Sequence, residues 1–237
     1  MLRWCEKMKM IRTKVVAVFL TAILLSYAVA VLPVIAATQT PPDPITVIKT
    51  GVDQVIAVFN DQQMPLNRRR EKLRSMSLGY FDFESMAKSA LGYHWRELTP
   101  AQRAQFVPLF TEFIQDAYLS KMEQATVEKI REEAQTANVQ FLKQTYFSSD
   151  YAEVFSTVAL QDHKDPLQVN YLLHQQDRQW RVYDVTVEAI SLIGNYRNQF
   201  NRIINNDGYS KLIADLQAKR EQLREYMDQE ARNSASH

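Results

Sequence analysis

The stretch Leu167–Gln175, with the sequence LQVNYLLHQ, is the clearest fold signal in the chain. Apolar residues occupy positions 167, 169, 171 and 173, and Gln168 and Asn170 separate the first three of them. Such alternation is typical of a strand with one buried face. Three further strands are predicted, over Val139–Phe147, Tyr151–Leu160 and Gln179–Val187. The gaps between them are too short for helical crossovers, which predicts an antiparallel meander.

Segments with helical spacing of apolar residues lie on both sides of these strands. The sequence Thr99-Pro100-Ala101-Gln102 combines a capping box with proline at the first helical position, so it marks a helix start. Helices are predicted over Pro44–Asn60, Pro65–Met76, Phe81–Leu91 with Asp82 as N-cap, from Pro100 to about Ala117, Ile190–Ile204 and Leu212–Leu223. This order indicates an α+β fold: a four-stranded antiparallel meander sheet with N- and C-terminal helices packed on one face.

The first 36 residues have the layout of a secretory signal peptide. Five basic residues precede an uncharged, mostly apolar run from Val15 to Leu32, and Val34-Ile35-Ala36 resembles a cleavage site. The alternative is an uncleaved anchor, because a run of 18 residues just reaches the length that spans a bilayer. We therefore expect a signal peptide over 1–36, a linker over 37–43, one domain over 44–227 and a polar tail over 228–237.

Composition excludes several classes of function. Without residues 1–36 the chain carries a net charge of −3, which gives no signal for a nucleic-acid partner. The single cysteine, Cys5, lies in the predicted signal peptide, so the mature chain has no disulfide, no thiol nucleophile and no cysteine metal site. The four histidines show no metal-ligand spacing, and no metal site is predicted.

Two clusters of charge could carry a function. Asp184 and Glu188 could form the acid pair of a glycoside hydrolase, although an N-cap or a salt bridge at the strand-to-helix junction explains them as well. Arg68, Arg69 and Arg70 form a basic run on a short helix. They are either a solvated face or a docking patch for an acidic partner or an anionic headgroup.

Two blocks of sequence carry a resemblance to a known family. The first block comprises FDFESMA at 81–87, GYHW at 92–95 and LTPAQ at 98–102; the second comprises WRVYDV at 180–185, EAISL at 188–192 and NYRNQF at 195–200. In this order they resemble the signature of the MlaC (toluene-tolerance) family, over roughly Ile45 to Leu223. Two departures are Ala189, where the family often has glycine, and Pro108 inside a predicted helix.

The resemblance implies a non-enzymatic periplasmic carrier of Gram-negative bacteria, with phospholipid as cargo and no cofactor. Family members bury the acyl chains between a curved sheet and helices. They shuttle lipid between an outer-membrane lipoprotein complex and an inner-membrane ABC transporter with an MCE-domain protein. One branch is linked to hopanoid-related lipids, and a structural or adaptor domain with a filled core is the remaining alternative.

For such a carrier, the cavity lies between the sheet and the helices. We expect its lining on the facing apolar stripes: Phe106, Phe110, Phe113, Val169, Tyr171, Leu173, Val185, Val187, Ile190, Ile193 and Tyr196. The strand face is sensitive to a one-residue slip, which would invert it. Arg68, Arg69 and Arg70 are then expected to dock a partner rather than to select the lipid.

Overall fold

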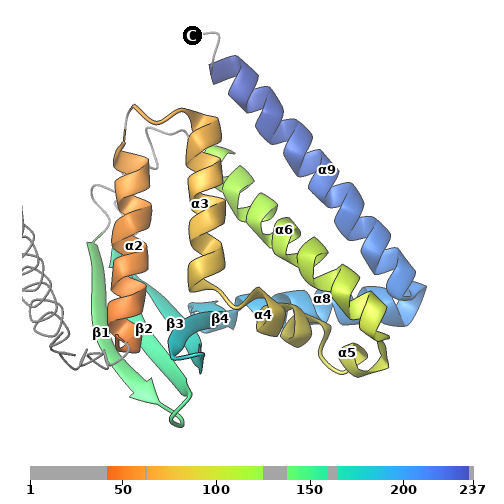
Figure 1. Cartoon of the computed structure of the whole chain (residues 1–237), viewed down its shortest axis with the longest axis horizontal. Helices are drawn as coiled ribbons and strands as arrows, with labels where there is room; N and C mark the ends of the chain where they lie inside the picture. Colours follow the sequence, from red (N-terminus) through yellow and green to blue (C-terminus); the bar gives the residue numbers. More distant parts are fainter. Residues whose placement is uncertain (1–41, 62, 125–137, 160–164, 235–237) are drawn as a thin grey trace, which may run out of the picture. The chain divides into compact units, whose positions relative to one another are not determined.

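The computed structural model describes residues 42–61, 63–124, 138–159 and 165–234 (Figure 1). These residues fall in one compact unit that spans Pro41–His237. The predicted signal peptide, most of the predicted linker and the last three residues lie outside the described residues.

A meander sheet forms the first layer of the fold. The strands β1 (Asn138–Tyr146), β2 (Tyr151–Ala159), β3 (Leu167–Gln176), β4 (Gln179–Val187) and β5 (Ile190–Ser191) follow one another in space as in sequence, and every pair is antiparallel. The α+β class and the meander are confirmed. The number of strands was wrong, because the sheet has five strands rather than four.

The fifth strand exists because a two-residue turn follows β4. Glu188 and Ala189 both have positive φ, 49° and 62°, as in the tight turns whose twist matches a β-hairpin. A helix was predicted to begin at Ile190. In the structure Ile190 instead pairs with Val187. Helix α8 (Leu192–Asp207) begins two residues later, where the Ser191 hydroxyl accepts from the amide of Gly194 at 2.7 Å.

Helices α2 (Pro44–Asn60) and α3 (Leu66–Tyr80) lie side by side over the sheet (Figure 1). The Asp43 carboxylate caps α2 by accepting from Thr46 N at 2.9 Å. Helix α2 and the inner face of the sheet share the sheet core, which comprises Ile48, Ala152, Val154, Leu173, Trp180 and Val182. After α3 the chain pairs with the free side of β4, through a bridge between Phe81 and Val182.

The remaining helices pack mainly on one another. They are α4 (Phe83–Leu91), α5 (His94–Glu97), α6 (Pro100–Gln124), α8 and α9 (Tyr209–Ser234). The predicted N-cap at Asp82 and the capping box at Thr99 and Gln102 are both present. Their shared helical core comprises Phe83, Met86, Ala87, Ala90, Leu91, Leu98, Phe106, Leu109, Phe110, Phe113, Ile114, Ile193, Phe200, Leu212 and Leu216.

This second core corrects the simple layer picture. Helix α9 packs along α6 rather than on the sheet, as Figure 1 shows at the right of the fold. Part of the predicted polar tail, residues 228–234, belongs to α9. The molecule thus has a sheet core and a helical core, and the candidate site lies in the space between them.

Candidate functional site

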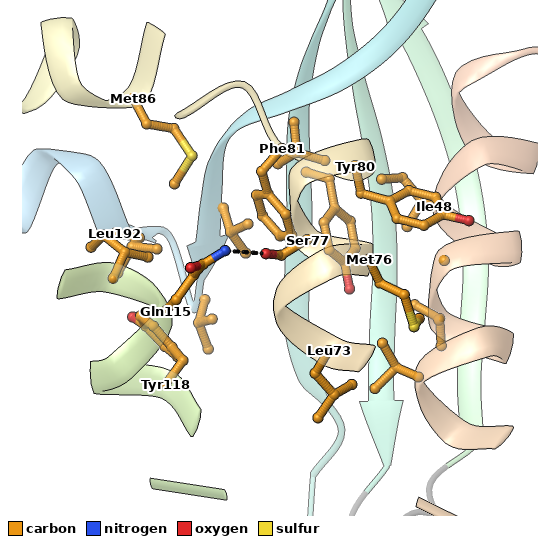
Figure 2. A pocket seen from close by; sticks show the side chains of 18 of the residues that line it. Ile48, Leu73, Met76, Ser77, Tyr80, Phe81, Met86, Gln115, Tyr118 and Leu192 are labelled. Atoms are coloured by element: carbon orange, nitrogen blue, oxygen red, sulfur yellow. Dashed lines mark hydrogen bonds between the residues drawn. The ribbon is translucent and has the colours of Figure 1, made fainter. Parts of the chain in front are cut away.

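A cavity of about 840 Å³ lies between the sheet core and the helical core. This volume is near the upper end of the range for small-molecule sites. Figure 2 shows side chains from α2, α3, α4, α6 and α8 converging on it. The apolar lining from the helices comprises Ile48, Val52, Val55, Ile56, Leu73, Met76, Tyr80, Phe83, Met86, Ile114, Leu119 and Leu192. The strands and the link after α3 add Phe81, Val139, Tyr171, Val182, Val185, Val187 and Ile190.

Helix α3 explains why this space stays open. It carries many charges, and its only buried residue is Arg69. Its apolar side chains Leu73, Met76 and Tyr80 face the cavity and are only half-buried. Because α3 brings no side chain that fills the space, it forms a wall rather than a packed layer.

A polar seam joins this wall to α6, and we define it as Arg74, Ser77, Gln115 and Asp116. The Gln115 amide donates to the Ser77 hydroxyl at 2.8 Å and to the carbonyl of Arg74 at 3.3 Å, and the first bond is drawn in Figure 2. One turn away, the Arg74 guanidinium donates to the carboxylate of Asp116. Arg220 from α9 donates to the same carboxylate at 3.4 Å and pairs with Glu112.

Two tyrosines at the cavity, Tyr118 and Tyr171, have neutral hydroxyl groups at physiological pH. Burial raises the pKa of Tyr171, against a smaller opposing effect from its hydrogen bond with Ser156. Burial also raises the pKa of Tyr118. The cavity therefore offers hydroxyls rather than phenolates, in a lining that is otherwise largely hydrocarbon.

Only four of the eleven predicted lining residues reach the cavity: Tyr171, Val185, Val187 and Ile190. Val187 and Ile190 are also exposed to solvent, at 42% and 69%, so they form part of the cavity's rim. Whether these four residues contact lipid stays a prediction.

The other seven lie elsewhere. Phe106, Phe110, Phe113, Ile193 and Tyr196 belong to or pack against the helical core, and Leu173 belongs to the sheet core; Val169, on the same strand face, is not among the lining residues. Burial against this aromatic cluster raises the pKa of Tyr196 to about 12. The predicted apolar stripes exist, but most of their side chains pack against other side chains in the two cores and do not line the cavity.

Sequence reasoning missed the α2 and α3 side of the cavity. The periodicity of Val52, Val55 and Ile56 was a usable signal for α2. For α3, six charged residues, five over 68–72 and one at 74, concealed Leu73 and Met76, which contribute to the wall.

The three predicted docking arginines do not form one exposed patch. Arg68 is exposed and pairs with Glu71 at 3.1 Å. Arg69 is buried and donates to the carbonyls of Asp61 and Met64, so it holds the turn between α2 and α3. Arg70 donates to the carbonyl of Met227 on α9. A docking role for these residues stays a prediction. Of the three side chains, only Arg68 is exposed to a partner.

Asp184 and Glu188 are engaged in backbone structure rather than facing each other as an acid pair. Asp184 accepts from Ile193 N at 3.0 Å and from the Ser191 hydroxyl at 2.5 Å, which fixes the start of α8. Glu188 accepts from Gln168 N at 2.5 Å across the end of the sheet. Asp184 therefore supports the start of α8, close to the N-cap role given above as the alternative, whereas Glu188 instead ties the turn after β4 to β3.

Two histidines have local partners instead of a metal-like arrangement. His94 is buried and contacts Glu97 at 3.2 Å and Asn201 at 3.0 Å, which joins α5 to α8. His174 lies 2.8 Å from a carboxylate oxygen of Asp82. Within the described residues, no group of three or more His, Cys, Asp or Glu side chains is placed to hold a metal ion. None of the described helices is long and apolar enough to cross a membrane.

The fold and the cavity define a class: an α+β protein whose apolar cavity lies between a meander sheet and a helical core. The sequence model of the family described as "MlaC protein" matches residues 49–218. The chain therefore belongs to the MlaC family, as the sequence blocks indicated.

A solved structure shares this fold. It is a phospholipid-binding protein from Ralstonia solanacearum, determined in complex with a phospholipid. The TM-score is 0.63 at 22% sequence identity, and the alignment covers 77% of this chain and 99% of that one. The comparison with curated proteins gave no match.

Proposed function

We propose that this protein is a carrier that holds the acyl chains of a phospholipid in the cavity and does not act as an enzyme. The observation that carries the proposal is the 840 Å³ cavity itself, with its largely hydrocarbon lining between two separately packed cores. Membership of the MlaC family and the phospholipid in the Ralstonia solanacearum neighbour support it. The contacts of Asp184 and Glu188 argue against the hydrolase alternative.

The energetics of extraction explain why such a cavity is needed. Two acyl chains of about 16 carbons gain roughly 25 kcal/mol from burial, at about 0.8 kcal/mol per CH₂. A bilayer already provides this burial, so a carrier must offer a comparable hydrocarbon environment. Release then requires a partner that favours the empty form.

The wider proposal places this carrier in the periplasm after cleavage of residues 1–36. There it exchanges lipid between an outer-membrane lipoprotein complex and an inner-membrane ABC transporter with an MCE-domain protein. The secretory layout of the N-terminus and the family support this setting. The test is to load purified protein with labelled phospholipid and to measure transfer to vesicles with and without the reconstituted transporter.

Two bulky substitutions on the same face of the sheet test the cavity. Val185 lines the cavity and is half-buried, whereas Val154 is fully buried in the sheet core. Val185→Trp should fill space that the lipid occupies, with little loss of stability in lipid-free protein. Val154→Trp should cost about 1–3 kcal/mol or more, because it overpacks a filled core.

Native mass spectrometry of gently purified protein measures the cargo, and thermal unfolding of stripped protein measures stability. We expect phospholipid on the unmodified protein and none on Val185→Trp. A lipid-free unmodified protein, or equal destabilisation by both substitutions, would contradict the proposal.

A further inference from the structure

A second cavity, of about 570 Å³, lies beside the first at the junction between α2 and β1, and we call it the side cavity. Three of its lining residues, Val52, Ile56 and Val139, also line the first cavity. We call these three residues the partition. Lys49 and Asp53 border the side cavity only, and both are exposed. The two cavities are therefore separated by a single layer of side chains.

The partition is made of aliphatic side chains. Each of the three is half-buried, because a cavity lies on either side of it. They meet through van der Waals contacts, which are individually weak. Small movements of α2, or changes of rotamer, can break and remake such contacts. Parting these side chains breaks no side-chain hydrogen bond, because valine and isoleucine side chains cannot form one.

Helix α2 is hydrogen-bonded to β1 at its N-terminal end. Among the described residues, the bond between the two elements joins Ile45 N to Oε1 of Gln144 at 2.9 Å. Ile56 lies roughly three turns further along α2. Near that end the hydroxyl of Tyr80 on α3 donates to Gln54 at 3.1 Å. The part of α2 that carries Ile56 is therefore bonded to α3 rather than to β1, and it can separate from β1 without losing that bond.

The partition lies at the opposite edge of the sheet from the exposed rim. The rim residues Val187 and Ile190 belong to β4 and β5, whereas Val139 belongs to β1. The strand order places β1 and β5 at the two edges of the sheet, and Figure 1 shows α2 beside β1. The first cavity therefore spans the width of the sheet, from an exposed rim to a closed partition.

We infer that the junction between α2 and β1 is a second opening of the cavity, closed by the partition, through which acyl chains enter and leave. This inference rests on the proposed carrier function and adds a route to it. A passing chain replaces the aliphatic contacts of the partition with its own, so hydrocarbon stays shielded from water during the passage. Beyond the partition, the exposed polar side chains of Lys49 and Asp53 mark the change from hydrocarbon to water.

The first test locks the junction. Cys5 is the only cysteine of the chain and lies in the predicted signal peptide, so mature protein that begins at residue 37 offers no competing thiol. Asp53→Cys with Val139→Cys places one thiol on each side of the junction, and a short reducible crosslinker joins them. The protein is loaded with pyrene-labelled phosphatidylglycerol before crosslinking. Fluorescence then follows transfer to a large excess of phosphatidylcholine vesicles, which drives release by mass action. We expect the lock to slow transfer about tenfold, because the gate can no longer open, and reduction to restore the rate.

A control lock shows whether crosslinking itself slows transfer. Tyr93→Cys with Asn205→Cys joins two exposed residues whose side chains are hydrogen-bonded at 3.0 Å, next to the helical core. Neither residue is among the lining residues of the two cavities. This lock should leave the transfer rate unchanged.

A pair of alanine substitutions tests the partition without a crosslinker. Ile56→Ala thins the partition and should speed transfer several-fold. Val55→Ala is the matched control, because Val55 is the half-buried neighbour that lines the first cavity but not the side cavity. It should leave the rate of transfer unchanged.

Thermal unfolding checks that each variant folds, and if the double-cysteine protein does not fold, the alanine pair still decides the question. Equal transfer rates before and after reduction of the lock overturn the second opening and leave the carrier function standing, because the rim then suffices. Equal slowing by the control lock, or equal acceleration by Ile56→Ala and Val55→Ala, overturns it as well. Failure of the unmodified protein to take up the labelled lipid overturns the proposed function itself.

Discussion

The helical core and the cavity wall share helix α6, but they use its side chains differently. Phe106 and Phe110 are fully buried and contact each other with ring centroids 5.8 Å apart, and Phe200 meets both rings edge-on. Further along the helix, Gln115 and Tyr118 border the cavity, and Gln115 holds α3 by its hydrogen bond to Ser77. Filled packing therefore provides stability at one end of α6, and incomplete packing leaves a cavity at the other.

The largest expected effect tests the filled end. Phe110→Ala should lower the free energy of unfolding by about 3–5 kcal/mol, because it opens a hole in a packed aromatic cluster. Leu73→Ala removes a side chain that already borders a cavity and should cost less than about 1 kcal/mol in lipid-free protein. Urea unfolding of both variants measures the difference. Equal losses would show that the wall is as well packed as the core.

A smaller effect is expected where α2 meets α3. A Cβ atom at Gly51 would lie 3.0 Å from Cε1 of Tyr80, whose hydroxyl donates to Gln54 at 3.1 Å. Gly51→Ala should push this ring into the cavity and reduce bound lipid. The stability change should stay within about 1 kcal/mol, because alanine favours the helix by about 0.5–1 kcal/mol.

Gly79→Ala is the control for this prediction. Nothing lies within 4 Å of a Cβ atom at Gly79, so only the helix preference acts there. Stability should rise slightly, and lipid content by native mass spectrometry should not change. The same result at Gly51 would mean that Tyr80 does not limit the cavity.

The smallest effect concerns the turn at the rim. Ala189 has a φ of 62°, a conformation that costs about 1 kcal/mol for a residue with a side chain. Ala189→Gly should therefore raise the free energy of unfolding by up to about 1 kcal/mol. Ala218→Gly, on the exposed face of α9, should lower it by about 0.5–1 kcal/mol. Thermal unfolding should show shifts of opposite sign, and shifts of the same sign would rule out strain at the turn.

The sequence predicted most elements of the fold, since its local signals were strong. Alternation in β3, the capping box at Thr99 and the N-cap at Asp82 all correspond to the structure. The turn at Glu188 and Ala189 could not be predicted, because neither residue is typical of positive φ. Local pattern therefore carried the element assignments, and the exceptions occur where the backbone takes a rarer conformation.

The site was harder to predict than the fold for a physical reason. An apolar stripe shows that a face is buried, but it does not show whether protein or ligand covers that face. Phe106 and Phe110 are covered by aromatic side chains of α8, whereas Val185 borders the cavity. The cavity side depends on the position of α3, which the contact between Arg74 and Asp116, 42 residues apart in sequence, helps to hold.

Helix α6 also has a consequence for how the family can diverge. Its core-facing and cavity-facing residues lie on adjoining turns, so a lineage can alter the cavity at Tyr118 or Leu119 without changing Phe106 or Phe110. Substitution at the core positions is limited by side-chain volume, because adding or removing even one methylene group disturbs a close-packed core. Under the proposed carrier function, substitution at the cavity positions is limited by the shape of the bound lipid. Relatives that carry different lipids are therefore expected to vary in side-chain size at 118 and 119 and to conserve total volume around 106 and 110.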